Sequence, residues 1–128
     1  MLAKIIVVDD ERSIADSVAE IVGGAGYEVR TAYTGPEAVT AAGNFDPNLL
    51  LTDVLMPGMN GFELALLVKQ ACPSCRLILF SGQAATAALA LRFAQEFTSR
   101  GFNFILLPKP IHPARLLEKL QESLAQAA

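Results

Sequence analysis

Short apolar runs alternate along the chain with segments whose apolar residues recur at helical spacing. Five runs predict strands at residues 4–8, 27–33, 49–52, 77–80 and 102–107. The run at 27–33 alternates polar and apolar residues, which predicts an edge strand, whereas 49–52 is solidly apolar and predicts a central strand. Helix-like segments follow the runs, and they cover residues 14–24, 34–42, 62–71 and 84–99 and the stretch that begins at Pro113.

The regular alternation of strands and helices predicts an α/β fold. Connections of this kind are right-handed and give a parallel sheet with helices on both faces. A chain of 128 residues fits one domain, and no repeat or linker interrupts the pattern, so we expect a single domain over residues 1–128. Ligands of such sheets bind beyond the carboxyl ends of the strands, where the strand order reverses.

The composition narrows the classes of partner. The chain is 52% hydrophobic, as expected for strands that are apolar on both sides, yet no apolar run reaches the roughly 18–20 residues that cross a bilayer. Acidic residues stand where a signal peptide would have its cleavage site, so we expect a cytoplasmic protein without membrane contact. Ten basic residues against 13 acidic ones give a net charge of −3. The basic residues form no stripe along the chain, so we do not expect direct binding of nucleic acid.

The two cysteines, Cys72 and Cys75, form a Cys-Pro-Ser-Cys motif between a predicted helix and a predicted strand. A thioredoxin-like redox motif has the reverse order, strand and then helix, and one pair supplies only half of the ligands of a structural zinc site. We therefore interpret the pair as two reduced thiols in a turn.

Three carboxylates are expected to meet at the carboxyl ends of the predicted strands. Asp9 and Asp10 follow the first strand, and Asp53 follows the third. Carboxylates crowded together repel one another unless a cation neutralises them. Magnesium takes one or two carboxylates, keeps several waters and completes its shell with phosphate oxygens, so the pattern predicts a Mg²⁺ site.

The fourth and fifth strands bring groups suited to a phosphoryl group to the same edge. Ser81 offers a hydroxyl, Gly82 leaves the approach open because it has no side chain, and Lys109 supplies a positive charge. A carboxylate such as Asp53 can serve as nucleophile and form an acyl phosphate. The set therefore indicates phosphoryl transfer, in which positioning and charge neutralisation supply most of the catalysis.

Four motifs taken together resemble the receiver domain of two-component response regulators. They are Asp9-Asp10, the stretch 49–61 around Asp53, Phe80-Ser-Gly82 and Pro108-Lys-Pro110, in the order of the family. The resemblance implies a flavodoxin-like (βα)5 doubly wound parallel sheet with strand order 2-1-3-4-5. It also implies a signalling domain, not an enzyme in the ordinary sense, that receives a phosphoryl group from a sensor histidine kinase or a phosphotransfer protein.

The resemblance further implies the role of each acidic residue. Asp53 would be the phosphoacceptor and a metal ligand. Asp10 would bind Mg²⁺ directly and Asp9 through water, with the backbone carbonyl of Leu55 as a further ligand.

The resemblance also implies a switch, and here the chain departs from the family. Ser81 would move toward the phosphoryl group that Lys109 holds, and the Lys109–Pro110 peptide bond would be cis. Receivers usually carry an aromatic switch residue three positions before the lysine, where this chain has Leu106. Phe104 would take that role only if the register of the strand shifted.

The stretch between Ser81 and Lys109 is longer than is common in the family, and we expect the extra length in the fourth helix or in residues 98–101. The face formed by helix 4, strand 5 and helix 5 is where family members dimerise or dock partners. We therefore expect an unusual partner surface there, with a homodimer as one form. His112 precedes Pro113 at a helix start and is interpreted as a cap or surface residue, not as a phosphodonor.

Two alternatives from other classes remain at this stage. A phosphatase or phosphotransferase of the haloacid-dehalogenase type also uses an aspartyl phosphate, but it needs a second acid two residues after the nucleophile, where this chain has Leu55. A flavin-binding module would need hydroxyl and amide donors after the first strand, whereas Asp9 and Asp10 would repel the phosphate.

Overall fold

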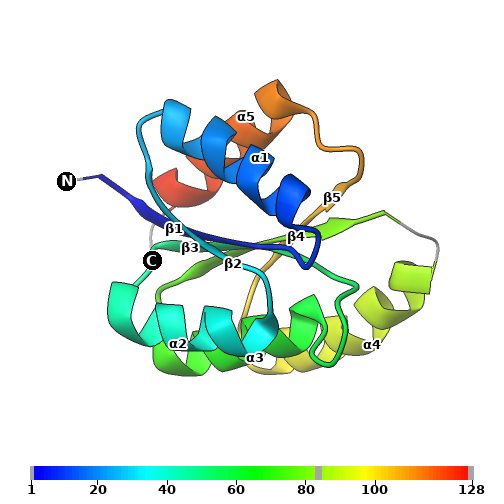
Figure 1. Cartoon of the computed structure of the whole chain (residues 1–128). Coiled ribbons are helices and arrows are strands. Elements are labelled where there is room, and N and C mark those ends of the chain that lie inside the picture. The colour runs from blue at the N-terminus through cyan, green and yellow to red at the C-terminus, as the bar shows by residue number, and fades with distance from the viewer. Residues whose placement is uncertain (1, 83–84, 127–128) are drawn as a thin grey trace.

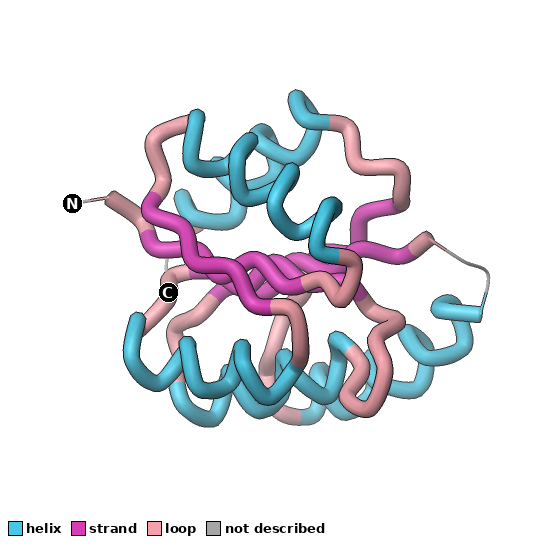
Figure 2. Tube along the Cα trace, viewed as in Figure 1, coloured by secondary structure: helices cyan, strands magenta, loops and turns pink. Residues whose placement is uncertain are grey.

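The computed structural model describes residues 2–82 and 85–126, and strands and helices alternate through them as the sequence predicts (Figure 1, Figure 2). The strands are β1 (Lys4–Val8), β2 (Glu28–Ala32), β3 (Leu49–Asp53), β4 (Arg76–Ser81) and β5 (Ile105–Pro108). The helices are α1 (Arg12–Gly24), α2 (Gly35–Phe45), α3 (Gly61–Ala71), α4 (Ala85–Ser99) and α5 (Pro113–Ala125). The predicted start of the fourth helix, Ala84, lies outside the described residues.

The strands form one parallel sheet in the order β2-β1-β3-β4-β5, which confirms the predicted flavodoxin-like fold. Helices α1 and α5 cover one face of the sheet, and α2, α3 and α4 cover the other (Figure 1). β2 lies at one edge, as its alternating pattern predicts, and β3 lies in the centre. Among the described residues, no helix is both long enough and apolar enough to cross a membrane.

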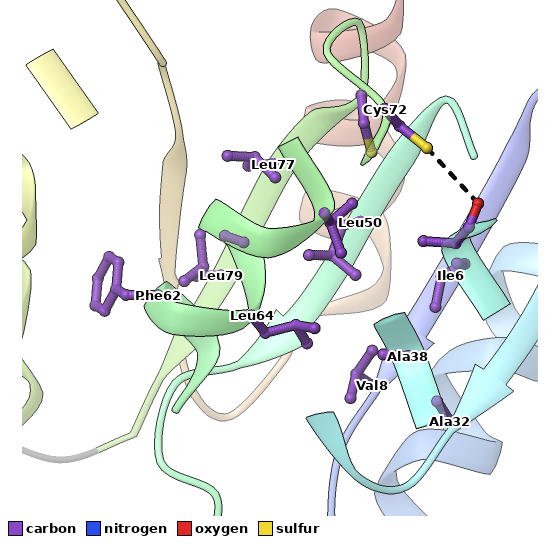
Figure 3. Close-up of a cluster of buried hydrophobic side chains, with 14 of the residues drawn as sticks. Ile6, Val8, Ala32, Ala38, Leu50, Phe62, Leu64, Cys72, Leu77 and Leu79 are labelled. Atoms are coloured by element: carbon purple, nitrogen blue, oxygen red, sulfur yellow. Dashed lines mark hydrogen bonds between the residues drawn. The ribbon is translucent and has the colours of Figure 1, made fainter. Parts of the chain in front are cut away.

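Successive residues of the central strands supply two separate cores. Ile5 and Val7 of β1 point toward the layer of α1 and α5, whereas Ile6 and Val8 point toward α2 and α3. Figure 3 shows the second core, which includes Ile6, Val8 and Leu64 of α3. Full burial of each such aliphatic side chain stabilises the fold by about 1.5–3 kcal/mol. Both cores therefore fix the carboxyl ends of the strands, where the polar residues lie.

The fifth strand is shorter than the sequence predicts. The predicted strand 102–107 begins with a stretch that is not strand, and β5 starts only at Ile105. The amide of Phe102 donates to the carbonyl of Phe97, and this hydrogen bond caps the carboxyl end of α4. The ring of Phe104 packs edge-on against Phe97, with ring centroids 5.0 Å apart. The apolar residues of this stretch thus cap and cover α4, and their pattern alone resembled a strand.

The second helix extends beyond its predicted end at Ala42. It begins after Thr34, whose hydroxyl accepts a hydrogen bond from the Glu37 amide, and it continues to Phe45. Asp46 then adopts a left-handed conformation with φ 54°, and its amide donates to the Ala42 carbonyl. The extra turn buries the Phe45 side chain, which explains why the helix does not stop earlier.

Cys72 and Cys75 are free and buried in the connection between α3 and β4, which confirms the prediction of two reduced thiols. The Cys72 thiol lies 3.6 Å from the carbonyl oxygen of Ala42 (Figure 3). Burial raises the pKa of the Cys75 thiol to about 12. Both thiols therefore act as small apolar side chains of the core.

Candidate functional site

The predicted polar residues gather where the strands end, on the side of the sheet from which α4 starts (Figure 1). Asp53 is the last residue of β3, and Asp9 directly follows β1. Lys109 directly follows β5, and its amide donates to the carbonyl of Ser81, the last residue of β4. The parallel register therefore converts four positions that are far apart in sequence into one site.

The Lys109 ammonium lies between two buried carboxylates. Its Nζ is 3.1 Å from Oδ1 of Asp53 and 3.2 Å from Oδ2 of Asp9. Asp53 is 8% exposed and Asp9 is 3% exposed, whereas Lys109 is half-buried. The Val54 amide donates to Oδ1 of Asp53, which fixes the orientation of this carboxylate. A buried carboxylate held by one lysine and one backbone amide is positioned to react.

The charges of the site act on one another. Burial raises the pKa of Asp53, the negative charge of Asp9 raises it further, and Lys109 and the Val54 amide lower it in part. For Lys109, burial disfavours the ammonium, but the contacts with Asp53 and Asp9 outweigh burial and raise its pKa. Lys109 thus favours the charged form of Asp53, although burial keeps the pKa of Asp53 above its usual value.

Three carboxylates of this site are placed to hold a metal ion. Asp9, Asp10 and Asp53 each offer one oxygen, and these oxygens lie within 4.8 Å of one another. The Lys109 ammonium pairs with Asp9 and Asp53, so one positive charge stands against three carboxylates and negative charge remains uncompensated. An all-oxygen ligand set with excess negative charge suits a hard divalent cation. Asp10 is exposed, which leaves the cluster open to solvent ions.

A cleft at the carboxyl ends of the strands contains further residues of the site. It has a volume of about 460 Å³, and its lining includes Leu55, Gly82 and Thr86 as well as Asp53 and Lys109. A Cβ added at Gly82 would lie 3.2 Å from Cδ of Lys109. Glycine at this position therefore avoids crowding the lysine side chain. The peptide bond that follows this lysine is cis.

The two residues considered as aromatic switch differ in their surroundings. Leu106 lies in β5 opposite Leu79 and is 38% exposed. Phe104 lies outside the strand, and its ring contacts the rings of Phe97 and Phe62. The register of β5 therefore keeps Leu106, an aliphatic residue, at the position for which the resemblance implies an aromatic one.

Two residues of this region were missed by sequence reasoning. Gly61 begins α3, and a Cβ there would lie 2.3 Å from the backbone oxygen of Asp53, so only glycine permits this approach. Thr86, in the first turn of α4, is hydrogen-bonded through its hydroxyl to the hydroxyl of Ser81. The sequence offered one signal for the second residue, a single polar side chain among the alanines that begin the helix.

His112 occupies the position before α5. Its side chain is exposed and makes no capping hydrogen bond with the helix. It is thus the surface residue that the sequence indicated, at a helix start.

Comparison with known proteins gives consistent matches over nearly the whole chain. The family model described as "Response regulator receiver domain" matches residues 5–121. The "Uncharacterized transcriptional regulatory protein YesN" of Bacillus subtilis is 34% identical over 96% of this chain and 33% of its own length. The "DNA-binding response regulator MtrA" of Mycobacterium leprae is 27% identical over 97% of this chain and 52% of its own length. The chain thus spans a third to a half of these curated relatives.

A solved structure matches the fold as well as the sequence. The "response regulator receiver domain protein (CheY-like)" of Methanospirillum hungatei JF-1 is 33% identical, with a TM-score of 0.83. The match covers 97% of this chain and 94% of that chain. The likeness therefore extends over nearly the whole chain.

Proposed function

The chain belongs to the receiver domains of two-component response regulators, and we propose that it accepts a phosphoryl group on Asp53. It is a signalling domain, and we propose that its own chemistry is limited to taking up and slowly losing this group. The matches do not support the haloacid-dehalogenase alternative, and the aliphatic Leu55 stands where such an enzyme needs its second acid. We propose one receiver domain over residues 1–128, in the cytoplasm.

The observation that carries the proposal is the position of the Lys109 ammonium between Asp53 and Asp9, at 3.1 Å and 3.2 Å. An ammonium beside the acceptor carboxylate provides the charge that a transferring phosphoryl group requires. Because Asp9 and Asp53 both hold this ammonium, it is fixed before the donor arrives. Such preorganisation lowers the barrier of a reaction that depends on positioning.

The transfer itself is a displacement at phosphorus. A carboxylate oxygen of Asp53 forms a P–O bond while the P–N bond of the donor phosphohistidine breaks. The electron pair of the broken bond returns to the imidazole nitrogen, which takes up a proton. Lys109 binds an oxygen of the transferred group, and the Ser81 hydroxyl donates to another. Gly82 leaves this approach free of side-chain atoms.

We propose Mg²⁺ as the metal ion of the acidic cluster. Asp9, Asp10 and Asp53 would hold it, with the backbone carbonyl of Leu55 from the same cleft. When bound, the ion neutralises charge on the phosphoryl oxygens. The carboxylates of Asp9 and Asp10 then serve to hold the ion beside the acceptor.

The proposed partners are a sensor histidine kinase or a phosphotransfer protein as donor and a protein that reads the phosphorylated state. The face of α4, β5 and α5 is the proposed docking or homodimer surface, and Leu91 and Leu106 on it are 76% and 38% exposed. Two relatives are named as transcriptional or DNA-binding regulators. We propose a similar regulatory output for a longer protein that contains this domain.

The test is phosphorylation by acetyl phosphate, followed by intact mass. We expect the wild-type chain to gain the mass of one phosphoryl group with Mg²⁺ and to gain none when a chelator removes the metal. Asp53→Asn, which keeps the size of the side chain, should gain none under either condition. A phosphorylated Asp53→Asn protein would identify another acceptor and refute the assignment.

A further inference from the structure

The hydroxyl of Ser81 already has a partner in the unphosphorylated protein. It is hydrogen-bonded to the hydroxyl of Thr86. Ser81 ends β4, and Thr86 is the second residue of α4. The bond therefore ties the edge of the sheet to the first turn of the helix that follows it.

Thr86 lies beside the reacting groups and is closed off from bulk solvent. It lines the same cleft as Asp53, Gly82 and Lys109, yet only 2% of it is exposed. A buried hydroxyl is retained where it makes a hydrogen bond, because an unpaired one costs free energy. The contact with Ser81 is thus a specific feature of a helix start that is otherwise rich in alanine.

An aromatic switch does not account for coupling between the site and α4 in this chain. Leu106 is aliphatic, and the Phe104 ring is wedged between Phe97 and Phe62, with centroid distances of 5.0 Å and 5.4 Å. Movement of the Phe104 ring would break both aromatic contacts. The hydroxyl pair of Ser81 and Thr86 offers a direct connection instead.

We propose that Thr86 is a positioning residue that competes with the phosphoryl group for the Ser81 hydroxyl. The inference rests on the proposed function. Before phosphorylation, the bond to Thr86 holds Ser81 against the start of α4. When Asp53 carries a phosphoryl group, Ser81 donates its hydrogen bond to a phosphoryl oxygen, the bond to Thr86 breaks, and the first turn of α4 is released.

The direction of this exchange follows from charge. A hydrogen bond from a hydroxyl to an anionic oxygen is roughly twice as strong as one between two neutral hydroxyls. Ser81 therefore bonds to the phosphoryl group in preference to Thr86. The binding of the phosphoryl group is weakened by the free energy of the Ser81–Thr86 hydrogen bond that must break. One neutral hydrogen bond corresponds to about a fivefold change in an equilibrium constant.

The first experiment measures the affinity for beryllium fluoride, a phosphoryl mimic, in the presence of Mg²⁺. Thr86→Val keeps the shape of the side chain and removes the competitor, so we expect binding about fivefold tighter than in the wild type. Thr86→Ser keeps a hydroxyl and should bind as the wild type does. In a Ser81→Ala background, Thr86→Val should have no effect, because the two residues act through one bond.

A Thr86→Val protein that is folded but binds no more tightly would overturn the inference. An equal gain in affinity from Thr86→Val in the Ser81→Ala background would also overturn the inference, since a merely structural role of Thr86 would not depend on Ser81. If the wild-type protein binds no beryllium fluoride at all, the proposed function itself fails.

A second experiment tests the contact without any phosphoryl mimic. Amide hydrogen exchange of residues 88–91 in free protein reports the opening of the start of α4. We expect Thr86→Val, Ser81→Ala and the double variant all to exchange faster than the wild type, Ser81→Ala by about fivefold, which corresponds to the loss of the one bond between Ser81 and Thr86. Equal rates in all four proteins would show that the contact does not hold the helix and would overturn the inference.

Discussion

The amino end of α3 rests directly on the backbone of the proposed phosphoacceptor. The Gly61 amide donates to the Val54 carbonyl at 2.8 Å, and a Cβ on Gly61 would lie 2.3 Å from the backbone oxygen of Asp53. Neither group is a flexible side-chain end, so a larger residue cannot be accommodated by rotation. The position of Asp53 and the start of α3 are therefore fixed by the same contact.

Gly61→Ala should destabilise the protein, because the new methyl group meets backbone atoms of Asp53 and Val54. We expect a loss of about 1–3 kcal/mol in the free energy of unfolding, measured with urea. Gly43→Ala is the matched control, since a Cβ within α2 at that position meets nothing within 4 Å. It should stabilise the protein by roughly 0.5–1 kcal/mol. Equal effects of the two changes would contradict the close approach.

Lys109→Ala should separate metal binding from phosphorylation. The loss of an ammonium beside Asp9 and Asp53 leaves their negative charge for the metal, so Mg²⁺ should bind more tightly in calorimetric titration. The rate of phosphorylation by acetyl phosphate should fall by about 10²–10³-fold, the usual effect of removing one preorganised charge-stabilising donor. Lys119→Ala removes a surface lysine paired with Glu122 and should change neither quantity. Unchanged phosphorylation in Lys109→Ala would contradict the role of Lys109.

The buried thiols should resist alkylation. With a pKa of about 12, the Cys75 thiol is ionised in only about one molecule in ten thousand at pH 8, and burial raises the pKa of Cys72 as well. Iodoacetamide should therefore label neither cysteine of the native protein within the time that labels both in urea. Ser99→Cys, which places a thiol on the exposed end of α4, should add one rapidly labelled site. Rapid labelling of Cys75 in the native protein would show that the connection opens.

Phe104→Leu tests whether the ring at this position has a structural role. The substitution removes edge contacts with Phe97 and Phe62, and we expect a loss of about 1–2 kcal/mol in the free energy of unfolding. Affinity for beryllium fluoride should stay as in the wild type. A large drop in that affinity at unchanged stability would instead assign Phe104 to the switch.

The fold was predictable because its strands carry period-two or solid apolar patterns. Residues 49–51 of β3 are leucines that point to both sides of the sheet, and this strand lies in the centre, whereas the alternating second run lies at the edge. Positions such as Asp9 and Asp53 follow from the rule that parallel strands end at one edge. The sequence could therefore place these residues in one site without knowledge of side-chain geometry.

The features that sequence reasoning missed depend on contacts in three dimensions. The steric need for Gly61 arises only when α3 approaches Asp53, and the role of Thr86 depends on the direction of the Ser81 hydroxyl. Phe102 and Phe104 alternate with a polar residue as a strand would, yet the Phe102 amide caps α4 and both rings pack against Phe97 of that helix. Local patterns cannot distinguish these outcomes because tertiary packing decides them.

The most direct test of the central claim is the location of the phosphoryl group. After incubation with acetyl phosphate and Mg²⁺, borohydride reduction marks an acyl phosphate covalently, and peptide mapping by mass spectrometry identifies the residue. We expect the mark on Asp53 alone among the aspartates of the site. A mark on Asp9 or Asp10 and none on Asp53 would contradict the account.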